Sequence, residues 1–263
     1  MSNHRGYRDR VGLSGIPGLG ALLRRRRRRE GDLHQGPHPQ GPHPSPDRRP
    51  RLDGVPVDSL PPIVPEVRRG VRRRVTVVGE PVVHRPCRPV TVFDEALGTL
   101  IDDLFASMEV AHGVGLAANQ IGVDLRVFVY DCPDTWQVRH VGHVVNPVLE
   151  VPTPQEGPWQ QRSEGCLSVP GPVADLSRSL SAVVTGVDRY GRPVRLEGHG
   201  LFARALQHEC DHLDGTLYVD RLAPAARAAV LRESESIRGE VWASWDQRAQ
   251  ELGKQADVGQ GIL

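Results

Sequence analysis

Two histidines and a glutamate in the stretch QHECDHLDG have the types and the spacing of a metal site. His208, Glu209 and His212 form the pattern H-E-x-x-H, which many zinc peptidases share. On a helix, residues four apart lie on one face, so a single metal ion can bind both imidazoles. Two imidazoles do not complete a site, and a third ligand must come from elsewhere in the chain.

The upstream segment EGCLSVPG offers that third ligand. Zinc peptidases of this type usually take it from downstream of the helix, but the following segment, LDGTLYVDRLAPAA, has no further histidine. Cys166 lies among Gly, Ser and Pro residues, which predict an irregular backbone at a surface or cleft. One thiolate and two imidazoles leave a fourth position open, as in catalytic zinc sites. The residues therefore favour Cys166 as a ligand over Cys166 as a buried packing residue.

A third stretch, GVGLAANQIG at 113–122, could face a ligand. Its glycines allow the backbone to approach a bound molecule closely. Gln120 carries an uncharged amide that could donate to a developing oxyanion. By itself the stretch is more typical of a helix cap and turn than of a binding site.

The elements that must position these residues can be read from periodicity. Leu97 to Met108 carry apolar residues at helical spacing, which predicts a core-facing helix with Asp94 as its N-cap and an end at Gly113. Further helices are predicted from about 199 to 213 and from Pro224 to about Glu251. Strands are predicted at 125–130, 143–151 and 181–188, with DRYGRP as a hairpin turn. Strands flanked by helices without strict alternation indicate an α+β fold.

Charge divides the chain into two parts. Its 263 residues are 38% apolar, enough for one sizeable core. Residues 1–74 carry 17 arginines and 7 acidic groups, whereas the remainder carries 16 basic and 25 acidic groups. Residues 1–70, rich in Arg, Pro and His, are predicted to be disordered. The run Arg24–Arg29 could contact ribosomal RNA, although a solvated tail, or a start codon placed too far upstream, is the favoured explanation.

Composition also bears on location. The four cysteines form no CxxC pair, which argues against a disulfide framework. No apolar run approaches the length of a membrane span, and no secretion signal has the expected order of segments. We therefore predict a cytoplasmic protein that uses no membrane.

The three stretches together closely resemble a known family. G-x-G-L-A-A-x-Q, E-G-C-L-S and Q-H-E-x-D-H occur in the order of the three signature motifs of bacterial peptide deformylases, within roughly residues 75–225. The resemblance implies a catalytic domain at 71–225, with a C-terminal helix and tail at 226–263 that are compatible with the family. The basic extension at 1–70, which its composition predicts to be disordered, lies outside the resemblance. It also implies an α+β fold, with antiparallel or mixed β-sheets around a central metal-binding helix that carries H-E-x-x-H.

The resemblance assigns roles to individual residues. Cys166, His208 and His212 would bind one divalent metal ion, natively Fe(II), with zinc, nickel or cobalt as substitutes. Metal-bound water would be the nucleophile, and Glu209 the general base and later the general acid. The implied reaction removes the N-formyl group from the N-terminal formyl-methionine of nascent polypeptides and releases formate. The implied oxyanion donors are the Gln120 amide and the Leu167 backbone N–H.

The substrate is expected to bind as an added strand, with its methionine in an apolar pocket. The expected substrate-binding residues, with His212 also at the pocket, are Gly113, Val114, Gly115, Glu164, Gly165, Leu206 and Cys210. Cys210 is interpreted as a pocket or packing residue. We expect a monomer with no specific nucleic-acid partner. Association with the ribosome through the basic arm is an alternative that the sequence leaves open.

Two other functions compete with this one. A zincin-like endopeptidase is disfavoured because its downstream ligand is missing. A non-catalytic, ribosome-associated homologue is disfavoured because a scaffold would not need Glu209 or Gln120.

Overall fold

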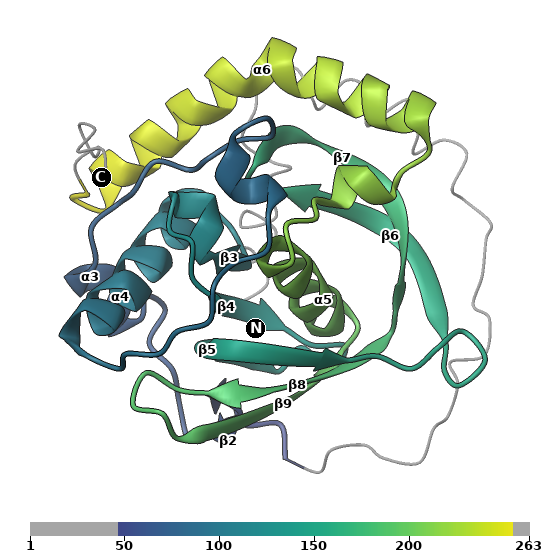
Figure 1. Ribbon diagram of the computed structural model, residues 1–263. Helices are drawn as coiled ribbons and strands as arrows, with labels where there is room; N and C mark the ends of the chain where they lie inside the picture. Colours follow the sequence, from purple (N-terminus) through teal and green to yellow (C-terminus); the bar gives the residue numbers. More distant parts are fainter. Residues whose placement is uncertain (1–46, 255–263) are drawn as a thin grey trace, which may run out of the picture.

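The protein, described here by a computed structural model of residues 47–254, combines a seven-stranded sheet with a two-stranded ribbon and three long helices (Figure 1). The strands are β1 (Arg51–Leu52), β2 (Val55–Pro56), β3 (Gly115–Ala117), β4 (Val127–Pro133), β5 (Arg139–Glu150), β6 (Trp159–Cys166), β7 (Val169–Ser179), β8 (Ser181–Val187) and β9 (Pro193–His199). The helices are α3 (Pro65–Arg69), α4 (Glu95–Val110), α5 (Leu201–Leu213) and α6 (Pro224–Glu251), with the 3-10 turns η1 (Pro81–His84), η2 (Ala118–Ile121) and η3 (Tyr218–Arg221).

β5 organises the large sheet. Its first half pairs antiparallel with β4 and its second half pairs antiparallel with β8, which continues to β9. β1 adds to β5 in the parallel direction, and β3 ends the sheet beyond β4. The sheet is therefore mixed, and the predicted α+β class is confirmed.

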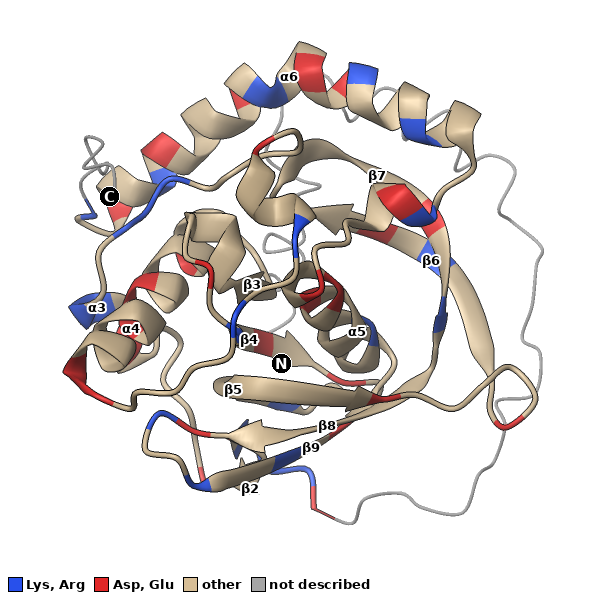
Figure 2. Ribbon diagram, in the orientation of Figure 1, with Lys and Arg blue, Asp and Glu red and all other residues tan. Residues whose placement is uncertain are grey.

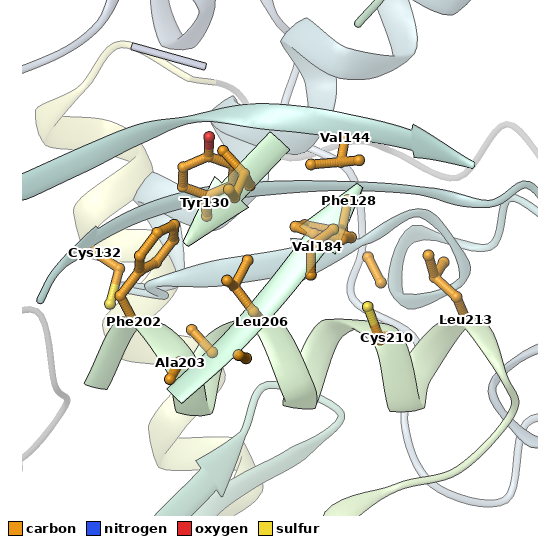
Figure 3. Packing of buried hydrophobic residues seen from close by; sticks show 14 of the residues in the cluster. Phe128, Tyr130, Cys132, Val144, Val184, Phe202, Ala203, Leu206, Cys210 and Leu213 are labelled. Carbon is orange, nitrogen blue, oxygen red and sulfur yellow. The ribbon is translucent and has the colours of Figure 1, made fainter. Parts of the chain in front are cut away.

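Helix α5 lies in the middle of the molecule (Figure 1). Every residue from Phe202 to Leu213 is buried. One face of the helix packs Phe202, Leu206 and Cys210 against Phe128 and other sheet residues (Figure 3). A helix covered on all sides must satisfy its polar side chains inside the protein. The histidines of H-E-x-x-H are therefore held by neighbours and not by bulk water.

The predicted helices on either side of this core are confirmed. α4 begins after Asp94, whose Oδ1 accepts a hydrogen bond from Leu97 N at 3.1 Å. α6 begins with Pro224, a residue suited to the first helical turn. It packs along β7, where Gly171 adopts φ +102 and an added Cβ would lie 2.8 Å from Cγ1 of Ile237. Glycine at that position lets the long helix approach the ribbon closely.

The predicted disorder of residues 1–70 is wrong for the end of that segment, where α3 forms. α3 packs on α4 through buried Val64 and Val67. Arg69 of α3 and Arg73 after it are paired: Arg69 Nε lies 2.7 Å and Arg73 Nη2 2.8 Å from carboxylates of α4. Figure 2 shows basic residues in blue on α3 and acidic residues in red on α4. Two buried valines in a short Pro-rich segment carry too little periodicity to predict a helix. The GPHP repeat and Arg24–Arg29 lie outside the described residues.

The ribbon of β6 and β7 replaces the irregular segment predicted around Cys166. The two strands pair antiparallel from Trp159 and Ser179 to Gly165 and Val173, and after a register shift Cys166 pairs with Val169. Leu167 and Ser168 form the tight turn of this hairpin, and the Gly and Pro residues lie at the register shift within its strands. Within residues 47–254, no helix is both long and apolar enough to cross a membrane.

Candidate metal centre and active site

Three side chains from two elements converge on one point. His208 and His212 project from the same face of α5, and their Nε2 atoms are 3.2 Å apart. Cys166 at the end of β6 brings its Sγ to 3.1 Å from Nε2 of His212. The three ligand atoms lie within 4.8 Å of one another, and all three residues are buried. The structure therefore assembles the predicted Cys/His/His group.

The donor set fits one divalent metal ion. A thiolate and two imidazoles suit iron, zinc, nickel or cobalt and do not select among them. Burial lowers the pKa of His212 well below its usual value, which keeps the imidazole neutral and able to act as a ligand. Three protein ligands leave a coordination position for a small molecule, the arrangement of catalytic sites.

Glu164 supports the histidine pair. Its Oε1 lies 2.8 Å from Nδ1 of His208, so the other ring nitrogen points at the metal position. Arg178 and Arg204 donate to the same carboxylate. Burial alone would raise the pKa of Glu164, but contacts with His208 and Arg178 hold it well below its usual value. Glu164 was predicted either to support a metal ligand or to form a wall of the substrate pocket. Its contacts with His208, Arg178 and Arg204 match the first role, and the second stays a prediction.

Glu209 lies beside the ligands without binding them. It is buried, and that burial raises the pKa of its carboxyl to about 7. Its Oε2 has no hydrogen-bond partner within the described part of the chain. Gly115 of β3 faces it so closely that an added Cβ would lie 2.8 Å from Cδ of Glu209. The carboxylate is therefore confined but keeps one oxygen available.

Gln120 and Leu167 approach the site from two other segments. Gln120 Oε1 accepts a hydrogen bond from Ala117 N at 2.9 Å, which fixes the amide and turns Nε2 inward. That Nε2 lies 3.2 Å from Ser168 Oγ and 3.7 Å from Cys166 Sγ. Leu167 lies in the turn between β6 and β7, and its side chain reaches Gly113, where an added Cβ would be 2.9 Å from Cδ1. The stretches GVGLAANQIG and EGCLSVPG therefore meet at the metal position.

Two predicted pocket residues lie elsewhere. Leu206 and Cys210 are 1% and 3% exposed and pack into the core between α5 and the sheet (Figure 3). Leu206 and Cys210 each lie two positions from His208 on α5, and side chains two apart on a helix point in different directions. They therefore occupy the face that contacts Phe128 and not the face of the metal ligands. Partly buried Val114 packs against the same core, and Gly165 pairs with Val173 in the ribbon. The prediction of Leu206 as pocket lining is therefore wrong, and of the two alternatives predicted for Cys210 the structure shows packing.

Several supporting residues were missed from sequence. Asn119 Nδ2 donates to the carbonyl of His212 at 2.6 Å, and Ser168 N donates to Cys166 Sγ at 3.3 Å. Asp211 pairs with Arg178 at 2.7 Å and with Arg221. The sequence did carry a signal for Arg204, the arginine in the apolar run FARALQHE. If the helix is buried, this arginine must pair with an anion inside the protein.

Fold and site together define a class: an α+β protein whose central helix presents H-E-x-x-H to a cysteine from a neighbouring hairpin. The comparisons with known proteins agree. Residues 72–228 match the family model described as Polypeptide deformylase. "Peptide deformylase 2" of Streptomyces avermitilis is 54% identical over 166 residues, 63% of this chain and 88% of that protein. The "Peptide deformylase" of Mycolicibacterium paratuberculosis is 51% identical over 182 residues, 64% of this chain and 92% of that protein.

A solved structure supports the same assignment. The crystal structure of a peptide deformylase from Legionella pneumophila superimposes with a TM-score of 0.59 at 37% identity, over 66% of this chain and 98% of that one. The chain belongs to the polypeptide deformylase family and is an enzyme, a hydrolase of the deformylase type. The family depends on a metal, and the Cys/His/His group fits that dependence.

Proposed function

We propose that this enzyme removes the N-formyl group from the N-terminal formyl-methionine of nascent polypeptides and releases formate. One observation carries the proposal: Cys166, His208 and His212 converge on one point, and the Gln120 amide lies 3.7 Å from Cys166 Sγ. Glu209, the residue after His208, is buried on the same helix. The membership of the chain in the deformylase family supports it. Fe(II) is the proposed native metal, with zinc, nickel or cobalt as substitutes.

A metal ion bound there would supply Lewis-acid activation of the attacking water and of the formyl oxygen. Glu209, whose Oε2 has no hydrogen-bond partner within the described residues, is the proposed group that takes a proton from that water and delivers it to the leaving amine. Gln120 Nε2 and the Leu167 backbone N–H are the proposed donors to the developing oxyanion. Loss of one such donor typically costs about 3–4 kcal/mol of transition-state stabilisation.

The proposed substrate path uses the end of the sheet. β3 pairs with β4 on one side and is the last strand of the sheet, so its other edge can accept an extended peptide. Such a peptide would run along Gly113–Gly115 and face the segment 164–167 of the ribbon. A formyl carbon carries only hydrogen, so a site this confined can admit it and exclude the Cα of an ordinary acyl group.

The proposal includes a cellular setting. We infer a cytoplasmic monomer that acts on chains as they leave the ribosome. For the arginine-rich segment at 24–29 a solvated tail stays the favoured explanation and ribosome association the alternative. Cosedimentation of full-length and arm-deleted protein with ribosomes across a salt series distinguishes the two.

The decisive experiment is anaerobic turnover of a formyl-Met tripeptide by the Fe(II)-loaded full chain, with the acetyl-Met analogue as control. We expect formate from the formyl peptide alone. Absence of formate from a folded, metal-replete sample would support a non-catalytic homologue. Cleavage of an internal peptide bond would support an endopeptidase.

A further inference from the structure

Arg204 ties the helix that carries the histidines to the ribbon that carries the cysteine. It precedes His208 by one helical turn on α5 and is only 7% exposed. Its Nη1 donates to Glu164 Oε2 at 2.7 Å and to the Leu176 carbonyl at 3.0 Å, and its Nη2 donates to the Gln160 carbonyl at 3.0 Å. All three acceptors belong to β6 or β7. One guanidinium therefore spans both strands of the ribbon.

The metal position depends on the relation between these two elements. His208 and His212 move with α5, whereas Cys166 moves with β6. A small slide of the ribbon along the helix would separate the thiolate from the imidazoles. A planar guanidinium with donors on two edges resists such a slide better than a single contact, because its bonds point in fixed directions.

Arg204 also completes the carboxylate that orients His208. Glu164 Oε1 lies 2.8 Å from His208 Nδ1 and accepts from Arg178 Nη2 at 2.7 Å. Glu164 Oε2 accepts from Arg178 Nε at 3.1 Å and from Arg204 Nη1 at 2.7 Å. The two arginines hold both oxygens, so the carboxylate cannot rotate away from the imidazole. Arg178 continues from there to Asp211, the neighbour of His212.

We propose that Arg204 is a positioning residue for the metal site. It sets the separation of α5 from the β6–β7 ribbon and locks the carboxylate of Glu164 against His208. The inference rests on the metal site of the proposed function, but it adds a claim: loss of Arg204 weakens and distorts metal binding beyond any loss of fold stability. A brace that only stabilised the fold would leave metal binding unchanged in the folded protein.

The test compares R204M with R139M in the metal-free full chain. Arg139 is a matched control, since its guanidinium also grips one carboxylate, Asp131 at 2.6 and 2.8 Å, and the carbonyl of Pro61 at 2.7 Å, but on β5 and away from the ligands. Cobalt(II) chloride is the probe, titrated against a chelator. The Co(II) absorption spectrum reports coordination geometry and thiolate ligation, and thermal unfolding reports stability.

We expect R204M to bind Co(II) about 10–100-fold more weakly than wild type, the usual effect of losing support for a metal ligand. Its Co(II) spectrum should change, whereas R139M should lower the Tm and leave affinity and spectrum at the wild-type values. R204K, which can keep only one of the three contacts, should fall between. In an E164Q background the R204M substitution should add less than it does alone.

Unchanged Co(II) affinity and spectrum in R204M, with a lowered Tm, would overturn the inference and leave Arg204 as a brace. If R204M does not fold, R204K decides, and wild-type affinity together with a wild-type spectrum would then overturn it. Failure of wild-type protein itself to bind Co(II) would refute the proposed metal site, and the inference would fall with it.

Discussion

The confinement of Glu209 by Gly115 makes a sharp prediction for G115A. The added Cβ would lie 2.8 Å from Cδ of Glu209, whereas carbon atoms pack at about 3.5–4.0 Å. The carboxylate must therefore retreat by roughly 0.7–1.2 Å. A misplacement of about 1 Å can cost on the order of 10²-fold in rate, equivalent to about 2.7 kcal/mol in the activation barrier.

We expect kcat for formate release from a formyl-Met tripeptide to fall about 100-fold in G115A. Folding should suffer little, because the clash is with the movable end of a side chain, and metal content should stay at the wild-type level. The control is G239A on α6, where an added Cβ meets nothing within 4 Å, and its kcat should equal that of wild type. A G115A enzyme with full metal content and a kcat within threefold of wild type would refute the argument. A rise in KM with kcat intact would show that Gly115 acts only through the substrate path proposed along Gly113–Gly115 and not through Glu209.

Four further predictions follow from other features. E209A should retain its metal, measured by elemental analysis, and lose about 10²–10⁴-fold in kcat; parallel loss of metal would make Glu209 a ligand. L206A should lower unfolding free energy by about 2–5 kcal/mol in a denaturant titration with KM within twofold, and a large rise in KM would restore its pocket role. Burial would raise the pKa of Asp188, but backbone and arginine donors of the β8–β9 turn outweigh it and hold that pKa below 3.8. D188N should therefore lower the free energy of unfolding by about 1 kcal/mol at pH 7. The difference between wild type and D188N should persist above pH 3.8 and fade as the pH falls through the folded pKa. A difference that grows on acidification would contradict this. Deletion of residues 1–46 should leave Tm and kcat unchanged. Deletion of residues 1–70 removes the contacts of α3 with α4 and should lower the Tm by several degrees. Equal Tm values for the two deletions would show that α3 contributes nothing to thermal stability.

Long elements with strong periodicity were predictable. The apolar stripe before Met108 and the cap at Asp94 define α4, and Pro224 marks the start of α6. The H-E-x-x-H spacing fixes the relation of His208 to His212, since helical geometry is the same wherever the helix lies. The class of the fold and the ligand pair therefore follow from local rules.

Relations across the chain were less accessible. The hairpin around Cys166 pairs residues whose Gly and Pro content predicts a loop, and the register shift at Gly165 supplies the bend. Leu206 lines a pocket or packs in the core depending on which face of α5 contacts the sheet. The apolar periodicity of the helix does not predict which neighbouring element each face contacts. Arg204 and Arg178 gain their roles only through acceptors on β6 and β7. Those contacts exist only once the ribbon crosses the helix.

The contact of Gly171 with Ile237 has a consequence for the order of biosynthesis. The ribbon that carries Cys166 is covered on this face by α6, whose Ile237 is made 66 residues after Gly171. At about 5–20 residues per second, that interval lasts roughly 3–13 s. During it the apolar side of β7 has no cover from its own chain. The last helix of the described residues therefore covers β7 late in synthesis, and chains that stall before it would present β7 to chaperones and proteases.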